Sequence, residues 1–432
     1  MIDIISINEK ALLNAKLRRI RQRNVALDTQ LMGEVAAIID DVRSRGDAAL
    51  IEYAQRFDGE LMLPADLRVS CETLLQTAAR ADSEVLEALR EAIKRVRMFH
   101  EHECEVSWEI AGANGVRLGQ RVTPLERVGL YVPGGTAGYP SSVVMNVVPA
   151  QVAGVDHIVV VTPPRSIERN PAVAAALVEL NVTEVYAVGG AQAIAAMAYG
   201  TETIPQVDKI TGPGNKYVAA AKKLVFGVVG IDSLAGPSEV VVIADDSASA
   251  SYIAADLLAQ AEHSDEASAI LITTSDRLAR EVARELKEQS DKLPRASIIQ
   301  RSLAKFGAII LAEDLERACA LINELAPEHL EIMARDEEQI SSLIKNAGAI
   351  FFGANSPEAA GDYLAGPNHV LPTGGTARFS SALSVHDFVK RTNLIRYQAS
   401  ELRRTALLIA VLARAEGLEA HARSALLRLE DN

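Results

Sequence analysis

Short apolar runs alternate with longer amphipathic stretches from residue 128 onward, and this alternation constrains the fold more than any other feature. The runs that predict strands are residues 129–132, 157–161, 184–188, 240–244, 269–272, 309–311 and 349–352. Helical periodicity between them predicts helices at residues 141–152, 171–180, 191–199, 215–225, 247–262 and 276–289. Strand–helix alternation is typical of parallel sheets covered by helices on both faces, so the sequence predicts an α/β fold.

The two ends of the chain lack this alternation. Residues 33–43, 51–57 and 83–103 carry apolar side chains at helical spacing, and Gly46 is suited to end the first of these helices. No strand pattern is visible from residue 384 onward, where the sequence predicts helices only. A helical tail after α/β domains often packs on another element, and a second subunit is one candidate.

A weak internal echo predicts two related α/β units. In one copy a strand is followed by a helix containing residues 149–151 and then by the strand HIVVV. In the other, the strand at 240–244 is followed by a helix containing residues 258–260 and then by AILIT. Chance resemblance is the competing explanation, because any two βαβ units look alike.

Composition excludes several classes of protein. The 432 residues carry a formal net charge of −13, which argues against nucleic acid or an anionic membrane as a partner. The longest apolar runs, such as residues 406–413, are shorter than the about 20 residues that span a bilayer. No secretory signal is visible at the start, and the widely spaced Cys71, Cys104 and Cys319 form no framework. We therefore expect a cytoplasmic protein without a thiolate zinc site.

Glycine-rich loops mark candidate binding positions for a phosphate-bearing ligand. They lie at residues 131–136, 211–216 and 236–239, and the first two stand between a predicted strand and a predicted helix. Glycine allows close approach of a ligand to the backbone, and a helix N-terminus favours anions. Neither of these two loops has a dinucleotide or Walker pattern, so ordinary βα turns remain the alternative.

Several histidines lie near carboxylates or amides in the second half of the chain. Gln260 and His263 share one face of a predicted helix, which suits a metal-ligand pair or a simple helix cap. Glu328 and His329 are adjacent on an extended segment, which suits two acid–base steps or a surface acid beside a half-buried histidine. The remaining candidates lie in a Gly/Pro-rich loop and in the tail: Asp362, His369, Glu416 and His421. Their joint occurrence predicts a metal or acid–base site.

Seven segments resemble a known family. In order, they are VGLYVPGGTAGYPSSVVMN, KITGPGNKYV, AGPSEVVVIAD, LAQAEH, APEHLE, GDYLAGPNHVLPTGGTARFSS and EGLEAHA. They resemble the successive signatures of the histidinol dehydrogenases and extend from about residue 127 to residue 422. The resemblance implies two related, incomplete Rossmann-like three-layer α/β/α domains with small helical N- and C-terminal segments.

The resemblance also implies domain boundaries and an assembly. Residues 1–25 would be an N-terminal helical segment, and residues 26–129 with 239–383 a discontinuous zinc and substrate domain. Residues 130–238 would form an NAD-binding domain. Residues 384–432 would be a helical tail that reaches the partner subunit of an intertwined homodimer with shared active sites.

The activity implied by the resemblance is a four-electron oxidation of L-histidinol to L-histidine through bound L-histidinaldehyde, with NAD and one zinc ion per subunit. These are the last two steps of histidine biosynthesis. Zinc would orient the substrate, His329 would be the general base and Glu328 would activate water. The implied zinc ligands are Gln260, His263, Asp362 and His421, and the implied NAD contacts are Tyr131, Gln192 and Asn215. The implied substrate contacts are Ser238, Gln260, His263, His329, Asp362, His369, Glu416 and His421.

One departure and three alternatives accompany this interpretation. Some family members carry cysteine in the strand where this chain has Val161 and Thr162, so a thiohemiacetal there is excluded and water attack on the aldehyde is favoured. A related dehydrogenase of another small primary alcohol, such as sulfopropanediol, is the nearest alternative. A zinc hydrolase or lyase and a non-catalytic binding protein are the others.

Overall fold

The computed structural model describes residues 2–23, 29–134 and 138–430. The chain divides into two compact units. The main unit comprises Met1–Glu103 and Glu126–Phe388, and the C-terminal unit comprises Cys104–Leu125 and Val389–Asn432. The main unit contains two parallel sheets covered by helices, so the predicted α/β class is confirmed.

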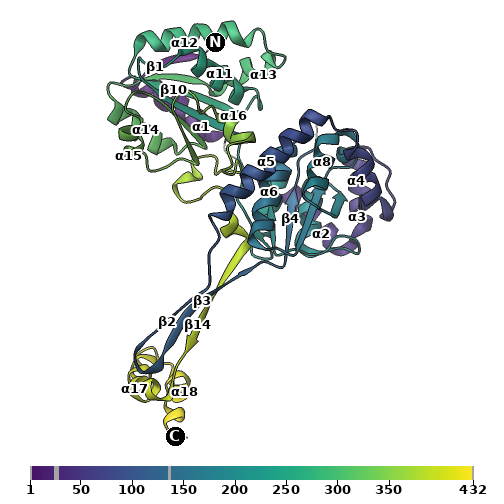
Figure 1. Ribbon diagram of the computed structural model, residues 1–432, viewed down its shortest axis with the longest axis vertical. Coiled ribbons are helices and arrows are strands. Elements are labelled where there is room, and N and C mark those ends of the chain that lie inside the picture. Colours follow the sequence, from purple (N-terminus) through teal and green to yellow (C-terminus); the bar gives the residue numbers. More distant parts are fainter. Residues whose placement is uncertain (1, 24–28, 135–137, 431–432) are drawn as a thin grey trace. The chain divides into compact units, whose positions relative to one another are not determined.

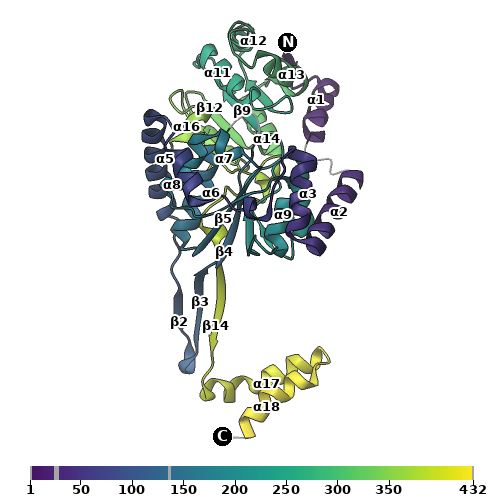
Figure 2. The same ribbon diagram turned by 90° about the vertical axis from the view of Figure 1, so that its right-hand side faces the viewer.

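The first sheet of the main unit has six parallel strands (Figure 1 and Figure 2). Alternate side chains of β9 (Glu239–Ala244), a central strand of this sheet, lie in two different cores, as expected for a strand buried on both faces. Val240 and Val242 join the core made with α11, α12 and α13, whereas Val241 and Ile243 join the core made with α1 and α14. The strand order is β1 (Asp3–Ser6), β11 (Ala308–Leu311), β10 (Ser268–Thr273), β9 (Glu239–Ala244), β12 (His329–Met333) and β13 (Ala349–Phe352). The covering helices are α1 (Lys10–Gln22), α11 (Ala250–Ala261), α12 (Asp276–Ser290), α13 (Ala296–Phe306) and α14 (Leu315–Leu325).

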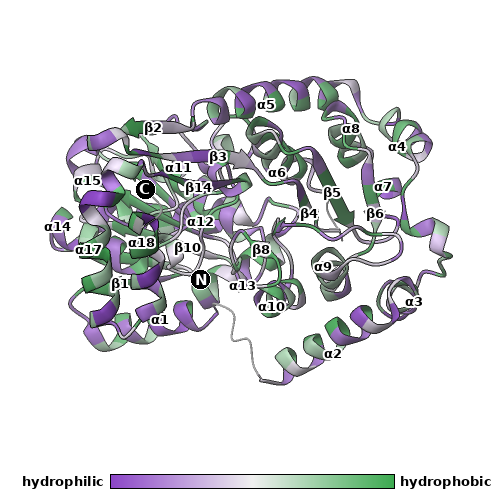
Figure 3. Ribbon diagram, turned by 90° about the horizontal axis from the view of Figure 1, so that it is seen from below, coloured by the Kyte–Doolittle hydropathy of each residue, from purple (hydrophilic) through white to green (hydrophobic). Residues whose placement is uncertain are grey.

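The second sheet of the main unit has five parallel strands, of which β5 is strongly hydrophobic (Figure 3). The order is β6 (Glu184–Ala187), β5 (His157–Thr162), β4 (Arg127–Tyr131), β7 (Lys209–Thr211) and β8 (Gly230–Ile231). Val159 and Val161 of β5 share a core with α2 (Thr29–Arg45), α9 (Gly190–Tyr199) and α10 (Lys216–Val225). The helices α5 (Ser83–Glu101), α6 (Pro140–Ala153) and α8 (Pro171–Glu179) pack against one another.

Both sheets have the same topology. If β4 to β8 are numbered 1 to 5 along the chain, their order across the sheet is 3-2-1-4-5. The strands β9 to β13 have the same order, and β1 is added at the edge beside β11. This is the order of a doubly wound fold without its sixth strand. The strand–helix–strand echo in the sequence corresponds to β4–α6–β5 and β9–α11–β10, which occupy equivalent places in the two sheets.

The shorter elements of the main unit complete its helical layers and connections. They are α3 (Asp47–Tyr53), α4 (Cys71–Ala78), α7 (Ser166–Arg169), α15 (Glu337–Leu343) and α16 (Glu358–Tyr363). A π-turn (Ala54–Asp58) follows α3, and 3₁₀ turns lie at Pro64–Leu67, Thr376–Arg378 and Val385–Phe388. The predicted helix end at Gly46 is confirmed, since α2 ends at Arg45 and Gly46 has φ 54°.

The C-terminal unit contains an antiparallel sheet and two helices (Figure 2). The strand β3 (Arg117–Pro124) pairs with both β2 (Trp108–Ala111) and β14 (Val389–Arg396). The helices α17 (Ala399–Ala415) and α18 (Glu419–Glu430) pack through Ala410, Ala413 and Ala422. A 3₁₀ turn at Ala113–Gly115 is joined to α17 by the Asn114 amide, which donates to Glu401 at 2.6 Å.

Three predicted boundaries differ from the structure. The N-terminal segment is not purely helical, because β1 pairs with β11 in the six-stranded sheet. Residues 29–53 contribute to the core of the five-stranded sheet, although the family resemblance implied that residues 26–129 belong to the zinc domain. The tail contains the strand β14, which the sequence analysis missed because its side chains are mostly exposed and show no apolar alternation.

Among the described residues, no helix has both the length and the apolar character needed to cross a membrane.

Candidate active site

Glu328 and His329 lie at the amino end of β12, next to the amino end of β9. The chain enters this position through Ala326, a buried residue with φ 48° that ends α14. One residue of β9 then holds both side chains through its backbone. The N–H of Glu239 donates to Glu328 Oε2 at 2.9 Å, and the carbonyl of Glu239 lies 3.1 Å from His329 Nδ1. The predicted acid–base pair therefore has a shared, buried support.

The hydrogen bond to Glu239 determines which nitrogen of His329 is free. A backbone carbonyl only accepts, so Nδ1 carries the proton and donates it, which leaves the Nε2 lone pair free. Burial lowers the pKa of His329 to about 3, so the ring is neutral near pH 7. Burial raises the pKa of Glu328 well above its usual value, and the nearby Glu239 and Asp362 add to this effect. Glu328 is thus a stronger base than an exposed carboxylate.

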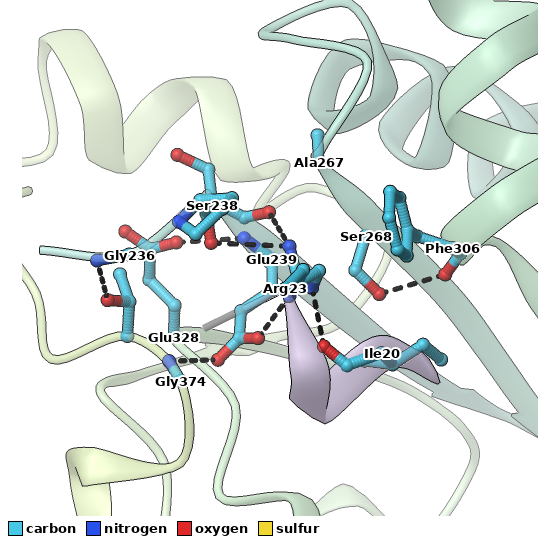
Figure 4. A network of polar contacts seen from close by, with 12 residues as sticks. Ile20, Arg23, Gly236, Ser238, Glu239, Ala267, Ser268, Phe306, Glu328 and Gly374 are labelled. Carbon is cyan, nitrogen blue, oxygen red and sulfur yellow. Dashed lines mark hydrogen bonds and ion pairs between the residues drawn. The ribbon is translucent and has the colours of Figure 1, made fainter. Parts of the chain in front are cut away.

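Arg23, at the end of α1, fixes the segment that supports this pair (Figure 4). Its guanidinium donates to the carbonyls of Pro237, Ser238 and Glu266 and to the side chain of Glu239. The other carboxylate oxygen of Glu239 accepts from the N–H of Gly374 at 2.9 Å. The Arg23 side chain is 1% exposed and that of Glu239 is 11% exposed, so this ion pair is largely removed from water.

Metal-binding groups gather beside the acid–base pair. Ligand atoms of His263, Glu358 and Asp362 all lie within 4.8 Å of one another. The buried amide of Gln260 lies against Glu358, and we assign its nitrogen to that side, because an amide oxygen there would face only acceptors. The nitrogen then lies 2.9 and 3.1 Å from the two carboxylate oxygens. The structure therefore brings together Gln260, His263 and Asp362, three of the four predicted zinc ligands, and adds Glu358.

The donor set fits a divalent cation. Burial raises the pKa of Asp362 to about 6, and burial together with Asp362, Glu328 and Glu331 raises the pKa of Glu358 well above its usual value. Carboxylates crowded in this way are stabilised by a nearby cation, which reverses the local pKa shifts. Nitrogen and oxygen ligands of this kind suit zinc in a site that keeps positions open for substrate.

His369 and Ser238 are each joined to a residue of the site by a hydrogen bond. His369 Nδ1 lies 3.1 Å from the carbonyl of Asp362, which leaves Nε2 free, and burial lowers the pKa of His369 to about 4. The preceding Asn368 is buried and donates to the carbonyl of Met145 in α6 at 2.6 Å, which anchors the loop. Ser238 directly precedes Glu239, and its carbonyl accepts from Arg23.

Glu416 and His421 belong to the C-terminal unit. Glu416 caps the C-terminus of α17, His421 lies in α18, and both are exposed within this chain. Their assignment to substrate and zinc stays a prediction.

The predicted NAD contacts lie at the carboxyl edge of the five-stranded sheet. Tyr131 ends β4, Gln192 is in the first turn of α9 after β6, and Asn215 follows β7. Tyr131 Oη accepts from the N–H of Gly190 at 3.1 Å, and Asn215 caps α10 by accepting from the N–H groups of Tyr217 and Val218. Residues 135–137 of the first glycine-rich loop lie outside the described residues.

The second glycine-rich loop is held by a buried ion pair. Lys222 Nζ donates to the carbonyl of Gly212 and to Asp232, and Asp232 accepts from the N–H of Gly212 at 2.8 Å. Gly212 has φ 105°, and a Cβ there would lie 2.2 Å from the Tyr131 carbonyl oxygen. Glycine is therefore required where this loop passes the end of β4.

Sequence reasoning missed four charged residues of this region: Arg23, Glu239, Glu331 and Glu358. All four are buried, but charged residues in a sequence are normally interpreted as exposed. One signal was available for Glu358, because it stands four residues before Asp362 and shares its face of a helix.

The comparisons with known proteins decide the family. The histidinol dehydrogenase family model matches residues 21–429. The chain belongs to the histidinol dehydrogenase family. A histidinol dehydrogenase of Geobacillus kaustophilus is 56% identical over 92% of this chain and 93% of its own length. That of Halalkalibacterium halodurans is 51% identical over 100% of both chains. The crystal structure of the Elizabethkingia anophelis histidinol dehydrogenase matches with a TM-score of 0.91 at 36% identity, covering 96% of each chain.

Family membership agrees with the resemblance seen in the sequence and makes the chain an enzyme of the oxidoreductase class. The matched range includes every residue predicted for the site, from Tyr131 to His421.

Proposed function

We propose that this protein oxidises L-histidinol to L-histidine through bound L-histidinaldehyde, reducing two molecules of NAD in the last two steps of histidine biosynthesis. The observation that carries the proposal is the shared support of Glu328 and His329 by the peptide of Glu239, beside the cluster around Asp362. Two differently tuned acid–base groups at one position suit two successive oxidations, each of which needs a proton acceptor.

Gln260, His263 and Asp362 would hold one zinc ion per subunit, with His421 as the fourth ligand. Zinc, when bound, would hold the amine and imidazole of the substrate, and it has no redox chemistry of its own. His369 and Ser238 would contact the substrate, as would Glu416. The free Nε2 of His369 suits a hydrogen bond from the substrate.

His329 would act as base in the first oxidation. Its Nε2 takes the proton of the alcohol as the carbon-bound hydrogen leaves as hydride, and the aldehyde forms. The Nδ1–H bond to Glu239 fixes the ring in the tautomer that this step needs. The low pKa of the ring keeps the lone pair available at neutral pH.

Glu328 would act before the second oxidation. Its carboxylate removes a proton from water as the oxygen adds to the aldehyde carbon, and His329 returns the proton taken from the alcohol to the aldehyde oxygen, which gives the hydrate and leaves His329 neutral. His329 then accepts a proton from the hydrate as the second hydride leaves, and the carboxylic acid forms. The raised pKa of Glu328 makes it a better acceptor for the water proton.

NAD would bind at the carboxyl edge of the five-stranded sheet, where Tyr131, Gln192 and Asn215 lie. NAD, when bound, accepts the hydride in each oxidation. The strands β5 and β6 lie on one side of β4, whereas β7 and β8 lie on the other, so the strand order reverses between β4 and β7. Such switch points are the usual ligand positions of doubly wound sheets.

An absorbance assay of NADH formation tests this proposal. We expect NADH from L-histidinol, loss of the reaction after treatment with a chelator, and recovery with zinc. NADH from sulfopropanediol but not from L-histidinol would replace the substrate. Retained zinc with no NADH from either alcohol would favour a hydrolase or lyase.

We also propose an intertwined homodimer in which the C-terminal unit completes the site of the partner subunit. The support is an exposed apolar face on α17, where Leu407, Leu408, Val411 and Leu412 are 61–68% exposed within one chain. Exposed apolar clusters of this kind mark interaction surfaces. Light scattering during gel filtration should give the mass of two chains.

Mixed dimers test the sharing of sites. Glu328→Gln and His421→Asn subunits are each expected to form L-histidine much more slowly than the parent when alone. In a mixed dimer, one of the two sites would combine an intact Glu328 with an intact His421, so activity should return. No recovery in the mixture would contradict shared sites.

A further inference from the structure

Glu358 faces the proposed metal ligands from a buried position at the first turn of α16. It is 2% exposed, and its carboxylate lies within 4.8 Å of ligand atoms of His263 and Asp362. Since Glu358 and Asp362 are four residues apart, both point from the same face of α16. His329 is also near, since its Nδ1 lies 3.7 Å from Glu358 Oε1.

The contact between Glu358 and Gln260 bears on which atom of the Gln260 amide faces the metal. An amide coordinates a metal through its oxygen, whereas its nitrogen only donates hydrogen bonds. Rotation by half a turn would exchange the two atoms at almost no change in shape. An amide oxygen on the Glu358 side would face only acceptors, so hydrogen-bond chemistry assigns the Gln260 nitrogen to that side, 2.9 and 3.1 Å from the two Glu358 oxygens. In this orientation the nitrogen is held and the oxygen is left for the metal.

A second contact ties Glu358 to the strand that carries the acid–base pair. The Oε1 atom of Glu331 accepts from the backbone N–H of Glu358 at 2.9 Å. Glu331 is two residues after His329 in β12, so both side chains lie on the same face of the strand. The start of α16 is therefore fixed relative to β12.

We propose that Glu358 is a positioning residue that holds the amide of Gln260 with its oxygen toward the metal. This inference rests on the zinc site of the proposed function. Hydrogen-bond partners that orient metal ligands usually contribute about 10- to 100-fold to metal affinity. We expect Glu358→Ala to weaken zinc affinity by about this factor. Glu358→Gln should weaken it less, because its amide oxygen still accepts from Gln260.

A double-mutant cycle on zinc affinity tests the inference. The full-length protein is stripped of metal, and zinc binding is measured against a competing chromophoric chelator for the parent, Glu358→Ala, Gln260→Ala and the double variant. Because Glu358 acts through Gln260, we expect Glu358→Ala to change affinity by less than about 2-fold when Gln260 is already alanine.

Asp47→Ala is the matched control, because Asp47 is another buried carboxylate that accepts hydrogen bonds, from Thr203, far from these ligands in the sequence. Its zinc affinity should equal that of the parent.

An unchanged affinity in Glu358→Ala overturns the inference, as does an equal effect in both backgrounds, which would make Glu358 a direct ligand. If the parent binds no zinc, the proposed zinc site and this inference both fail. A parent with zinc-dependent NADH formation but an unaffected Glu358→Ala removes the inference alone.

Discussion

Removing the Arg23 side chain tests whether a buried ion pair supports the acid–base residues. In Arg23→Ala, the Glu239 carboxylate stays buried with backbone N–H donors such as that of Gly374 but without its cationic partner, and the carbonyls of Pro237 and Ser238 each lose the Arg23 donor. Breaking a buried pair on one side costs about 3–5 kcal/mol. We expect the free energy of unfolding to fall by about that amount in urea titrations followed by circular dichroism.

Arg21→Ala is the control, since Arg21 lies two residues earlier in α1. Its ion pair with Glu324 joins side chains that are 48% and 59% exposed, so its loss should cost less than about 1 kcal/mol. Glu239→Gln should fall between the two, at about 1.5–3 kcal/mol, because Arg23 keeps its carbonyl partners. In Arg23→Ala protein that folds, we also expect kcat to fall by a larger factor than the factor by which KM for L-histidinol rises. Equal stability losses in Arg23→Ala and Arg21→Ala would refute the reasoning.

Three further variants test other parts of the account. His329→Asn should lower kcat by about 10²–10⁴-fold without changing zinc content, and loss of zinc would overturn its assignment as the base. Burial raises the pKa of Glu331 from 4.5 to about 8, so the folded protein binds this proton more tightly than the unfolded chain. The stability from this group is full below pH 4.5 and is lost as the pH rises to about 8. The metal-free Glu331→Gln protein, which keeps the oxygen that accepts from α16, should therefore gain stability over the parent in urea titrations as the pH rises from about 5 to 8. A constant difference over that range would contradict this. Gly212→Ala places a Cβ 2.2 Å from the Tyr131 carbonyl oxygen, so KM for NAD should rise while zinc affinity is unchanged, and an unaltered KM would remove this loop from the cofactor site.

Much of the α/β core was predictable because its strands are short, continuous apolar runs. β5 and β10 match their predicted ranges within one or two residues, since buried parallel strands need apolar side chains on both faces. β14 and β2 could not be found in this way. Their side chains are mostly exposed, and what specifies β14 is its pairing with β3, a distant partner.

The placement of residues 29–53 in the zinc domain was wrong for a different reason. The apolar face of α2 shows that the helix packs on a core, but nothing in its own sequence says which sheet provides that core. Its Val35 and Ile39 lie in the core that also contains Val159 of β5. The pattern of a helix specifies burial, whereas the partner is specified by the rest of the chain.

The predicted metal and acid–base residues of the main unit lie near one another because of the topology. α11 starts after the carboxyl end of β9 and runs back, so Gln260 near its end approaches the amino edge where Glu328 and Glu239 lie. Neither Arg23 nor Glu358 could be inferred from local sequence. Arg23 binds its partner more than two hundred residues away, and such contacts exist only in the folded chain.

The ratio of NADH to L-histidine produced from L-histidinol tests most directly whether one site performs both oxidations with divided roles. The parent protein should give a ratio of 2 throughout the reaction. In Glu328→Gln, hydration of the aldehyde should be slower than its formation, so the early ratio should exceed 2 while aldehyde accumulates. A ratio that stays at 2 in a slowed Glu328→Gln protein would contradict the assignment of water activation to Glu328.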